Sequence, residues 1–120
     1  MPRNGRGSDL FDVDVIRKGA KDYPGIVNDI APQVLEAGSA MVQADAILLA
    51  PVDTGNLRGS IVRRVLGNIA IVGTNVDYAQ HVEYGTRRSR AQPYLRPAID
   101  RNRKKIIGLM AELIRRATRA

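Results

Sequence analysis

The sequence lacks several residue types, and each absence excludes a class of function. It has no cysteine and no tryptophan, and only one histidine, one phenylalanine and four tyrosines among its 120 residues. Without cysteine the chain can form neither disulfide bonds nor thiolate metal sites, which is compatible with folding in a reducing cytosol. No apolar run approaches the roughly 20 residues of a membrane span, and the N-terminus does not resemble a secretion signal. We therefore expect a soluble single domain with a mainly aliphatic core.

Positive charge is concentrated in the C-terminal quarter of the chain. Residues 1–50 carry five Lys or Arg against seven Asp or Glu, residues 51–86 carry three against three, and residues 87–120 carry eleven against two, for a total of +7. Such a basic block attracts phosphate groups or faces an acidic surface of a neighbouring copy. The sequence leaves both alternatives open.

The first nine residues and the stretch after them differ in pattern. Residues 1–9 have no hydrophobic periodicity, which predicts a flexible arm. From 10 to 16, Phe11, Val13 and Val15 alternate with Asp12 and Asp14, which predicts a half-buried edge strand. The two aspartates on one face are typical of edge protection rather than of a metal site.

A helical pattern follows from 26 to 50, with Pro32 inside it. Because proline disfavours helix before it, we expect the main helix to start near Pro32, after a break at 29–31. Pro51 cannot continue this helix, and Asp53, Thr54 and Gly55 favour a tight turn. The apolar face of this helix is formed by Val34, Met41, Val42, Leu48 and Leu49.

A β-hairpin is predicted from 60 to 74, with a Gly67-Asn68 turn that pairs Leu66 with Ile69. Both faces of this hairpin are apolar. One carries Val62, Leu66, Ile69 and Ile71, and the other carries Ile61, Val65, Ala70 and Val72. Because one helix layer covers only one face, the second face must be covered by another helix or by another subunit.

The rest of the chain is predicted to be helical, apart from a loop at 86–92. The stretch 78–84 is predicted to be a short helix, capped by Asp77 and closed by Gly85 with a positive φ, with a third strand as the alternative. An amphipathic basic helix begins at Pro93, with an apolar stripe formed by Leu95, Ile99, Ile106, Met110, Leu113 and Ala117. The predicted fold class is therefore α+β: a small antiparallel sheet, made of the central hairpin and the N-terminal strand, packed against two main helices. Residues 10–120 form one domain.

One carboxylate and one arginine stand out on the helical faces. Asp45 projects to the middle of an apolar face, and Arg103 lies on the apolar stripe of the C-terminal helix. An unpaired buried charge is costly, so we expect a buried ion pair between Asp45 and Arg103, with Arg63 and Arg64 as the next candidates.

The residues offer little for catalysis. Asp53-Thr54-Gly55 is the triplet of aspartic proteases, but it follows a helix and Pro51 instead of an apolar strand, and a three-residue match is weak. His81 and Glu83 share the spacing that begins a zinc deaminase motif, but the cysteines that would complete the ligand set are absent. We expect no enzyme activity, no cofactor and no metal.

Basic side chains in the C-terminal quarter are candidates for a subunit interface or for contact with DNA. They are Arg87, Arg88, Arg90, Arg101, Lys104 and Lys105. No nucleic-acid reader motif is present, and few aromatic residues are available for stacking.

Three motifs over about half of the chain resemble the small tail-component family of long-tailed bacteriophages, the tail-completion or head–tail joining (neck) proteins. The motifs are Ala50-Pro51-Val52-Asp53-Thr54-Gly55 with Leu57, Arg58 and Ser60, then Tyr78-Ala79 and Val82-Glu83-Tyr84-Gly85-Thr86, then Pro93-Tyr94-Leu95-Arg96-Pro97-Ala98. Within them we expect a structural turn motif made of Pro51, Asp53, Thr54, Gly55, Leu57, Ser60, Glu83, Gly85 and Thr86.

The resemblance implies a structural protein of the virion tail or neck that is assembled in the host cytoplasm. It implies a connector subunit that forms a homo-oligomeric ring, expected to be hexameric, beside other neck or tail-tube proteins and with non-specific contact with DNA passing through the channel. A tail terminator is the first alternative, and a basic DNA-binding accessory protein is the alternative of another class.

Overall fold

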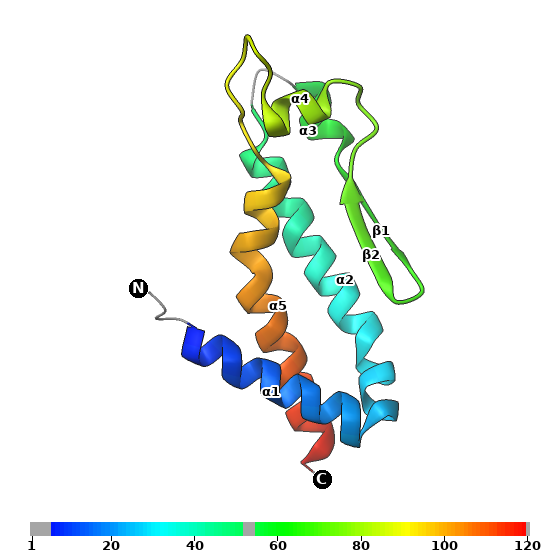
Figure 1. Ribbon diagram of the computed structural model, residues 1–120. Coiled ribbons are helices and arrows are strands. Elements are labelled where there is room, and N and C mark those ends of the chain that lie inside the picture. The colour runs from blue at the N-terminus through cyan, green and yellow to red at the C-terminus, as the bar shows by residue number, and fades with distance from the viewer. Residues whose placement is uncertain (1–5, 52–54, 120) are drawn as a thin grey trace.

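The computed structural model describes residues 6–51 and 55–119, and within them the fold is α+β, as predicted. The elements in chain order are α1 (Arg6–Asp22), α2 (Pro24–Leu49), α3 (Gly55–Ser60), β1 (Val62–Leu66), β2 (Ile69–Gly73), α4 (Ala79–Tyr84) and α5 (Leu95–Thr118). The two long helices, α2 and α5, lie side by side and antiparallel (Figure 1). None of the helices in these ranges is long and apolar enough to cross a membrane.

Helices α3 and α4 lie at one end of the long helix pair, the hairpin runs back alongside α2, and α1 lies across the other end of the pair (Figure 1). The main core forms where the second half of α2 meets α3, α4 and the start of α5. Its buried residues are Val42, Ala46, Ala50, Leu57, Ile61, Ala79, Tyr94 and Ala98. Tyr94 supplies the aromatic bulk of a core that is otherwise aliphatic, as the composition predicts.

The hairpin has the predicted register. β1 and β2 are antiparallel, with Leu66 opposite Ile69 and Arg64 opposite Ile71. Gly67 has a φ of 61°, and no described residue other than glycine has a positive φ. This is the pattern of a type II′ turn, whose twist matches that of the flanking strands.

The N-terminal strand predicted for 10–16 is wrong, because this stretch lies within helix α1. A run of five alternating residues is too short to distinguish a strand from a helix. Val15 and Gly19, four residues apart, also have the spacing of one helical face. Packing decides: a Cβ built on Gly19 would lie 2.9 Å from the Ile114 side chain of α5, so the two helices approach each other closely there. The predicted arm at 1–9 is helical from Arg6 onward, and residues 1–5 lie outside the described ranges.

The predicted break before Pro32 is also wrong. Helix α2 begins at Pro24, whose missing N–H costs nothing in the first turn, and it continues through Pro32. A proline inside a helix costs about 3 kcal/mol. Burial of Ile30 and Val34 on either side of Pro32 offsets that cost, since both residues are less than a tenth exposed.

Helix α5 buries a different line of residues from the one its sequence predicts. The buried residues are Ala98, Asn102, Ala111 and Ile114, whereas Ile99 is 46% exposed. On α2, Leu48 is likewise 67% exposed instead of lying on the apolar face. The buried residues of both helices include small ones, and a Cβ built on Gly38 of α2 would lie 3.2 Å from the Ile106 side chain of α5, so the two helices approach each other closely there.

Candidate functional site

The N-terminus of α5 is held by a carboxylate from α4. Glu83 Oε1 accepts hydrogen bonds from the backbone N–H groups of Tyr94 (3.0 Å) and Leu95 (2.9 Å), and its Oε2 accepts one from Arg96 (3.1 Å). The first turn of a helix has N–H groups without helical acceptors, and its positive dipole end favours a negative charge. The helix has no side-chain cap at its own N-cap residue, so Glu83 supplies the cap from 11 residues away.

Two aromatic residues flank this cap. Burial raises the pKa of the Tyr94 phenol, and the charge of Glu83 raises it further. The Tyr94 side chain therefore stays neutral beside the carboxylate at physiological pH. Tyr84 is 67% exposed, and the Arg96 guanidinium lies 5.5 Å from the centre of its ring, so that the two form an exposed cation–π pair at the corner.

The turn after α4 depends on Gly85, which has a φ of 79° and donates its N–H to His81 O (2.8 Å). Thr86 Oγ1 then accepts hydrogen bonds from Arg88 N (3.2 Å) and Ser89 N (3.0 Å). Gln92 N donates to Val82 O (2.8 Å), which closes the loop back onto α4. The loop that carries the arginines is therefore held at both ends by hydrogen bonds.

The first sequence motif lies against the core through α3. Leu57 is fully buried, and Ser60 Oγ donates to Leu57 O (2.9 Å) and hydrogen-bonds the Thr74 hydroxyl at the end of β2. Arg58 Nε donates to Ile47 O (2.9 Å) near the end of α2. Gly55 is the first residue of α3, and Pro51 directly follows the α2 cap. The predicted turn at Asp53 and Thr54 lies outside the described residues.

The predicted ion pair between Asp45 and Arg103 is wrong. Asp45 Oδ2 accepts a hydrogen bond from Asn102 Nδ2 (2.7 Å), and Asn102 also donates to Ala98 O (2.8 Å). Arg103 is an exposed residue that lies 3.5 Å from Asp100 on its own helix. The neutral amide of Asn102, which is 1% exposed, links the two long helices without burying a second charge.

The arginines named as alternatives for Asp45 also lie elsewhere. Arg63 pairs with Glu36 (2.8 Å) and ties β1 to α2, whereas Arg64 is exposed on the opposite face of the strand. Sequence patterns missed Asn102 because an asparagine on an apolar helix face predicts no particular partner. The position of Asn102, four residues after Ala98, could have indicated that it lies on the side of α5 that faces α2.

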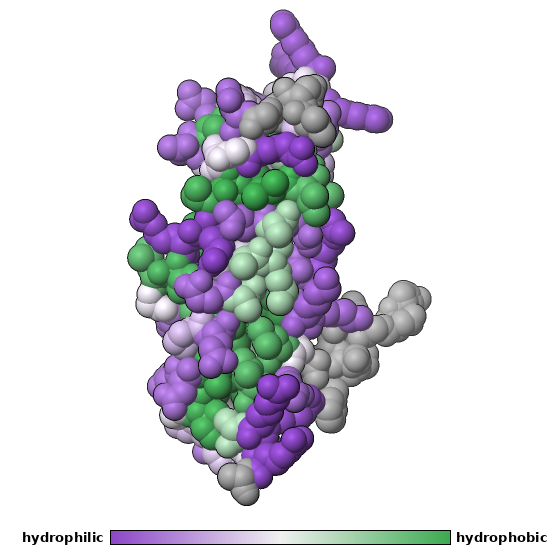
Figure 2. Space-filling model, turned by 180° about the vertical axis from the view of Figure 1, so that it is seen from behind, coloured by the Kyte–Doolittle hydropathy of each residue, from purple (hydrophilic) through white to green (hydrophobic). Residues whose placement is uncertain are grey.

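The hairpin packs one face on α2 and leaves the other uncovered. The outward apolar residues are all more than half exposed: Val62 59%, Leu66 55%, Ile69 59% and Ile71 52%. In Figure 2 the hairpin and its apolar side chains lie at the left margin. These four residues, here called the outer face, form the apolar surface that the sequence left without a cover.

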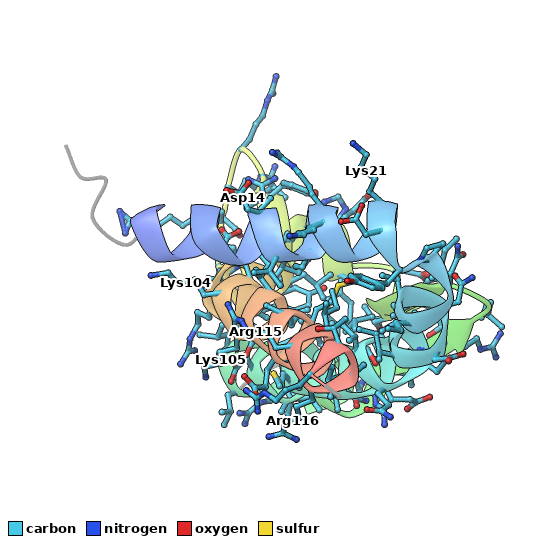
Figure 3. All side chains as sticks on the ribbon, turned by 90° about the horizontal axis from the view of Figure 1, so that it is seen from below. Asp14, Lys21, Lys104, Lys105, Arg115 and Arg116 are labelled. Atoms are coloured by element: carbon cyan, nitrogen blue, oxygen red, sulfur yellow. The ribbon has the colours of Figure 1, made fainter. Side chains whose placement is uncertain are left out.

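The candidate basic residues lie in two places. Arg87, Arg88 and Arg90 are exposed on the loop beyond α4, and Arg101, Lys104 and Lys105 are exposed on α5. Figure 3 shows Lys104 and Lys105 on the outer side of α5. Arg116 pairs with Glu112 (3.1 Å) on the same helix, but no ion pair involves Arg101, Lys104 or Lys105 in the part of the chain that the structure describes.

The described residues contain no candidate metal site. No three His, Asp or Glu side chains there are grouped so that they could hold a metal ion. His81 is exposed on α4, while the nearby Glu83 is engaged by the N-terminus of α5. Within the described residues, Glu83 therefore connects α4 to the start of α5.

Comparison with known families gives one match. The model of the HK97-gp10-like family, described as a tail component of bacteriophage HK97-gp10 type, matches residues 14–85. This range covers more than half of the 120 residues. No curated protein and no solved structure gave a significant match. The matched range includes α2, the hairpin and α4 with Glu83, but it ends before the N-terminus of α5 that Glu83 caps.

Proposed function

Since the chain belongs to the HK97-gp10-like family of bacteriophage tail components, we propose that it is a ring-forming subunit of the tail-completion or head–tail connector (neck) region of the virion. Such a role is structural and needs no catalytic group. A hexamer is the ring size that we propose. A tail terminator is the alternative position within the same structure.

The outer face of the hairpin supports this proposal most directly. Four aliphatic side chains on two short strands are more than half exposed, and no described helix covers them. Exposed apolar patches of this kind mark surfaces that become buried in an assembly. Head-to-tail contacts between identical subunits form a closed ring when the rotation from each subunit to the next adds up to one full turn.

The test compares lysine at two neighbouring positions of β2. Ile71 lies on the outer face, so Ile71→Lys is expected to leave the monomer folded and to abolish assembly. Val72 packs against the core, so Val72→Lys is expected to unfold the domain instead. Helical circular dichroism and thermal melting report folding, while size-exclusion chromatography with light scattering and incorporation into virions report assembly.

Exposed Lys18→Arg on α1 is the control, because it keeps the charge, lies outside the hairpin and should change neither folding nor assembly. Normal incorporation of Ile71→Lys into infectious particles would contradict the proposal. So would the absence of the wild-type chain from the virion.

Contact with DNA is the second candidate role. Arg101, Lys104 and Lys105 are exposed within five residues of α5 and have no ion-pair partner in the described part of the chain. If they contact DNA phosphates, affinity for duplex DNA should fall steeply with rising salt, and replacing all three by glutamine should reduce the slope by about three counterions. A slope near zero would assign the basic surface to a protein neighbour.

A further inference from the structure

The two strands of the hairpin form the whole described sheet, so each has an unpaired outer edge. The two-residue turn makes Leu66 and Ile69 a hydrogen-bonded pair, and hydrogen-bonded and non-hydrogen-bonded pairs alternate along an antiparallel ladder. The backbone N–H and C=O groups of Ala70 and Val72, which belong to non-hydrogen-bonded pairs, therefore point away from β1. The same alternation directs those of Arg63 and Val65 away from β2. Both edges therefore offer backbone groups to a further strand.

The edge of β2 carries none of the features that proteins use to block such pairing. No charged residue and no proline occurs between Arg64 and Asp77. Natural edge strands are usually protected by lysine, proline, a bulge or a covering element. A strand that lacks all of these is expected to be covered in the functional assembly.

An apolar groove runs beside this same edge. It has a volume of about 230 Å³. Its lining comes from α2, β2 and α5, namely Val34, Leu35, Gly38, Ser39, Val42, Ala70, Val72, Ile99 and Ile106. A strand added to β2 would place its inward side chains over this groove, against Ile99 and Ile106. The groove explains why Ile99 is half exposed in the single chain.

We infer that the β2 edge is covered by strand β1 of the next copy, so that the hairpins of neighbouring subunits form one continuous antiparallel sheet. This inference rests on the proposed ring. Cyclic symmetry keeps the direction of each strand along the ring axis. Because β1 and β2 run in opposite directions within one subunit, β2 and the β1 strand of the neighbour are then antiparallel as well.

The distribution of charge favours this pairing over the two symmetric ones. β1 carries Arg63 and Arg64, so two β1 strands side by side would repel each other. Two β2 strands would pair without repulsion, but they would close a dimer and leave both β1 edges open. Pairing of β2 with β1 uses every edge, places inward Val65 of the neighbour over the groove, and sets its outward side chains beside Ile71.

Cysteine cross-linking tests the inference directly, since the natural chain has no cysteine. Ile71→Cys protein is mixed in turn with Val62→Cys, Arg64→Cys or Leu66→Cys protein, all at exposed positions on the outward side of the hairpin, and oxidised at a concentration where the oligomer forms. A disulfide-linked dimer that contains one of each variant is expected from at least one mixture. Mass spectrometry of the linked peptides identifies the strands, and a Gly59→Cys variant on α3 serves as the control.

A second variant blocks the edge without changing the outer face. Ala70→Pro removes an N–H that is not used within the hairpin, so the monomer should remain folded while the oligomer is lost, and Ala70→Ser should behave like the natural chain.

Cross-linked dimers from Ile71→Cys protein alone would overturn the inference in favour of β2–β2 pairing. A ring that persists in Ala70→Pro without mixed cross-links would overturn it while leaving the proposed function intact. A chain that stays monomeric at its highest soluble concentration, with no cross-link, would also overturn it, and absence from virions would reject the proposed function itself.

Discussion

Replacing Glu83 with alanine is expected to destabilise the domain by about 3 kcal/mol, because three N–H groups at the start of α5 lose their charged acceptor. The residue is 7% exposed, so water cannot readily replace its carboxylate. Glu83→Gln keeps one acceptor oxygen and should cost about half as much. Chemical denaturation of the purified chain, monitored by circular dichroism, gives both values.

Glu112 provides the control for the effect of removing a negative charge. Its side chain is 45% exposed and pairs with arginines on its own helix, so Glu112→Ala should change stability by less than about 0.5 kcal/mol. A Glu83→Ala variant as stable as Glu112→Ala would show that the hydrogen bonds to the α5 terminus contribute little. The assignment of Glu83 as a structural residue would then be wrong.

Replacing Gly85 with alanine is expected to lower the free energy of unfolding by about 3 kcal/mol, for two reasons. Its φ of 79° and ψ of 174° lie in a region that is almost restricted to glycine. A Cβ at this position would also lie 2.7 Å from the backbone nitrogen of Ala91, which belongs to the closing side of the loop. The backbone would have to move, and the position of the loop arginines would move with it.

Two other glycines separate these two effects. Gly67→Ala adds a Cβ at a positive φ where nothing lies within 4 Å, so it should show only the conformational cost of about 1 kcal/mol. Gly59→Ala on α3 also meets nothing within 4 Å and has no positive φ, so it should cost nothing and slightly stabilise the helix. If Gly85→Ala lowers the free energy of unfolding by no more than Gly67→Ala does, the close contact with Ala91 adds nothing to the cost of the substitution.

Local patterns predicted the parts of the fold that depend on neighbouring residues. The Gly67-Asn68 turn determined the register of the hairpin, since a two-residue loop between apolar runs has few alternatives. Gly85 was placed at a positive φ because glycine tolerates it after a short helix. The same patterns failed at 10–16, where five alternating residues fit both a strand and the helix that packing on α5 selects.

The roles of two polar residues depended on contacts across long separations in the chain. Glu83 belongs to one of the sequence motifs, but only the packing of α4 beside the start of α5 brings its carboxylate to the free N–H groups of that helix. Asp45 was recognised as needing a partner, yet the partner is Asn102 and not Arg103. A helical wheel gives the direction of a side chain relative to its own axis, but not the rotation of one helix against another.

By itself, the sequence determined the α+β class, the hairpin and its register, the two long helices, and the family to which the chain belongs, because each rests on local turn chemistry, periodicity or a linear motif. Only the tertiary structure decided which face of the hairpin remains uncovered. Packing Val72 and Arg63 toward α2 turns Ile71 and Leu66 outward, and with two apolar faces the sequence favours neither. The choice comes from the one helix layer that lies against the sheet, and it leaves the opposite face and both strand edges available to another subunit.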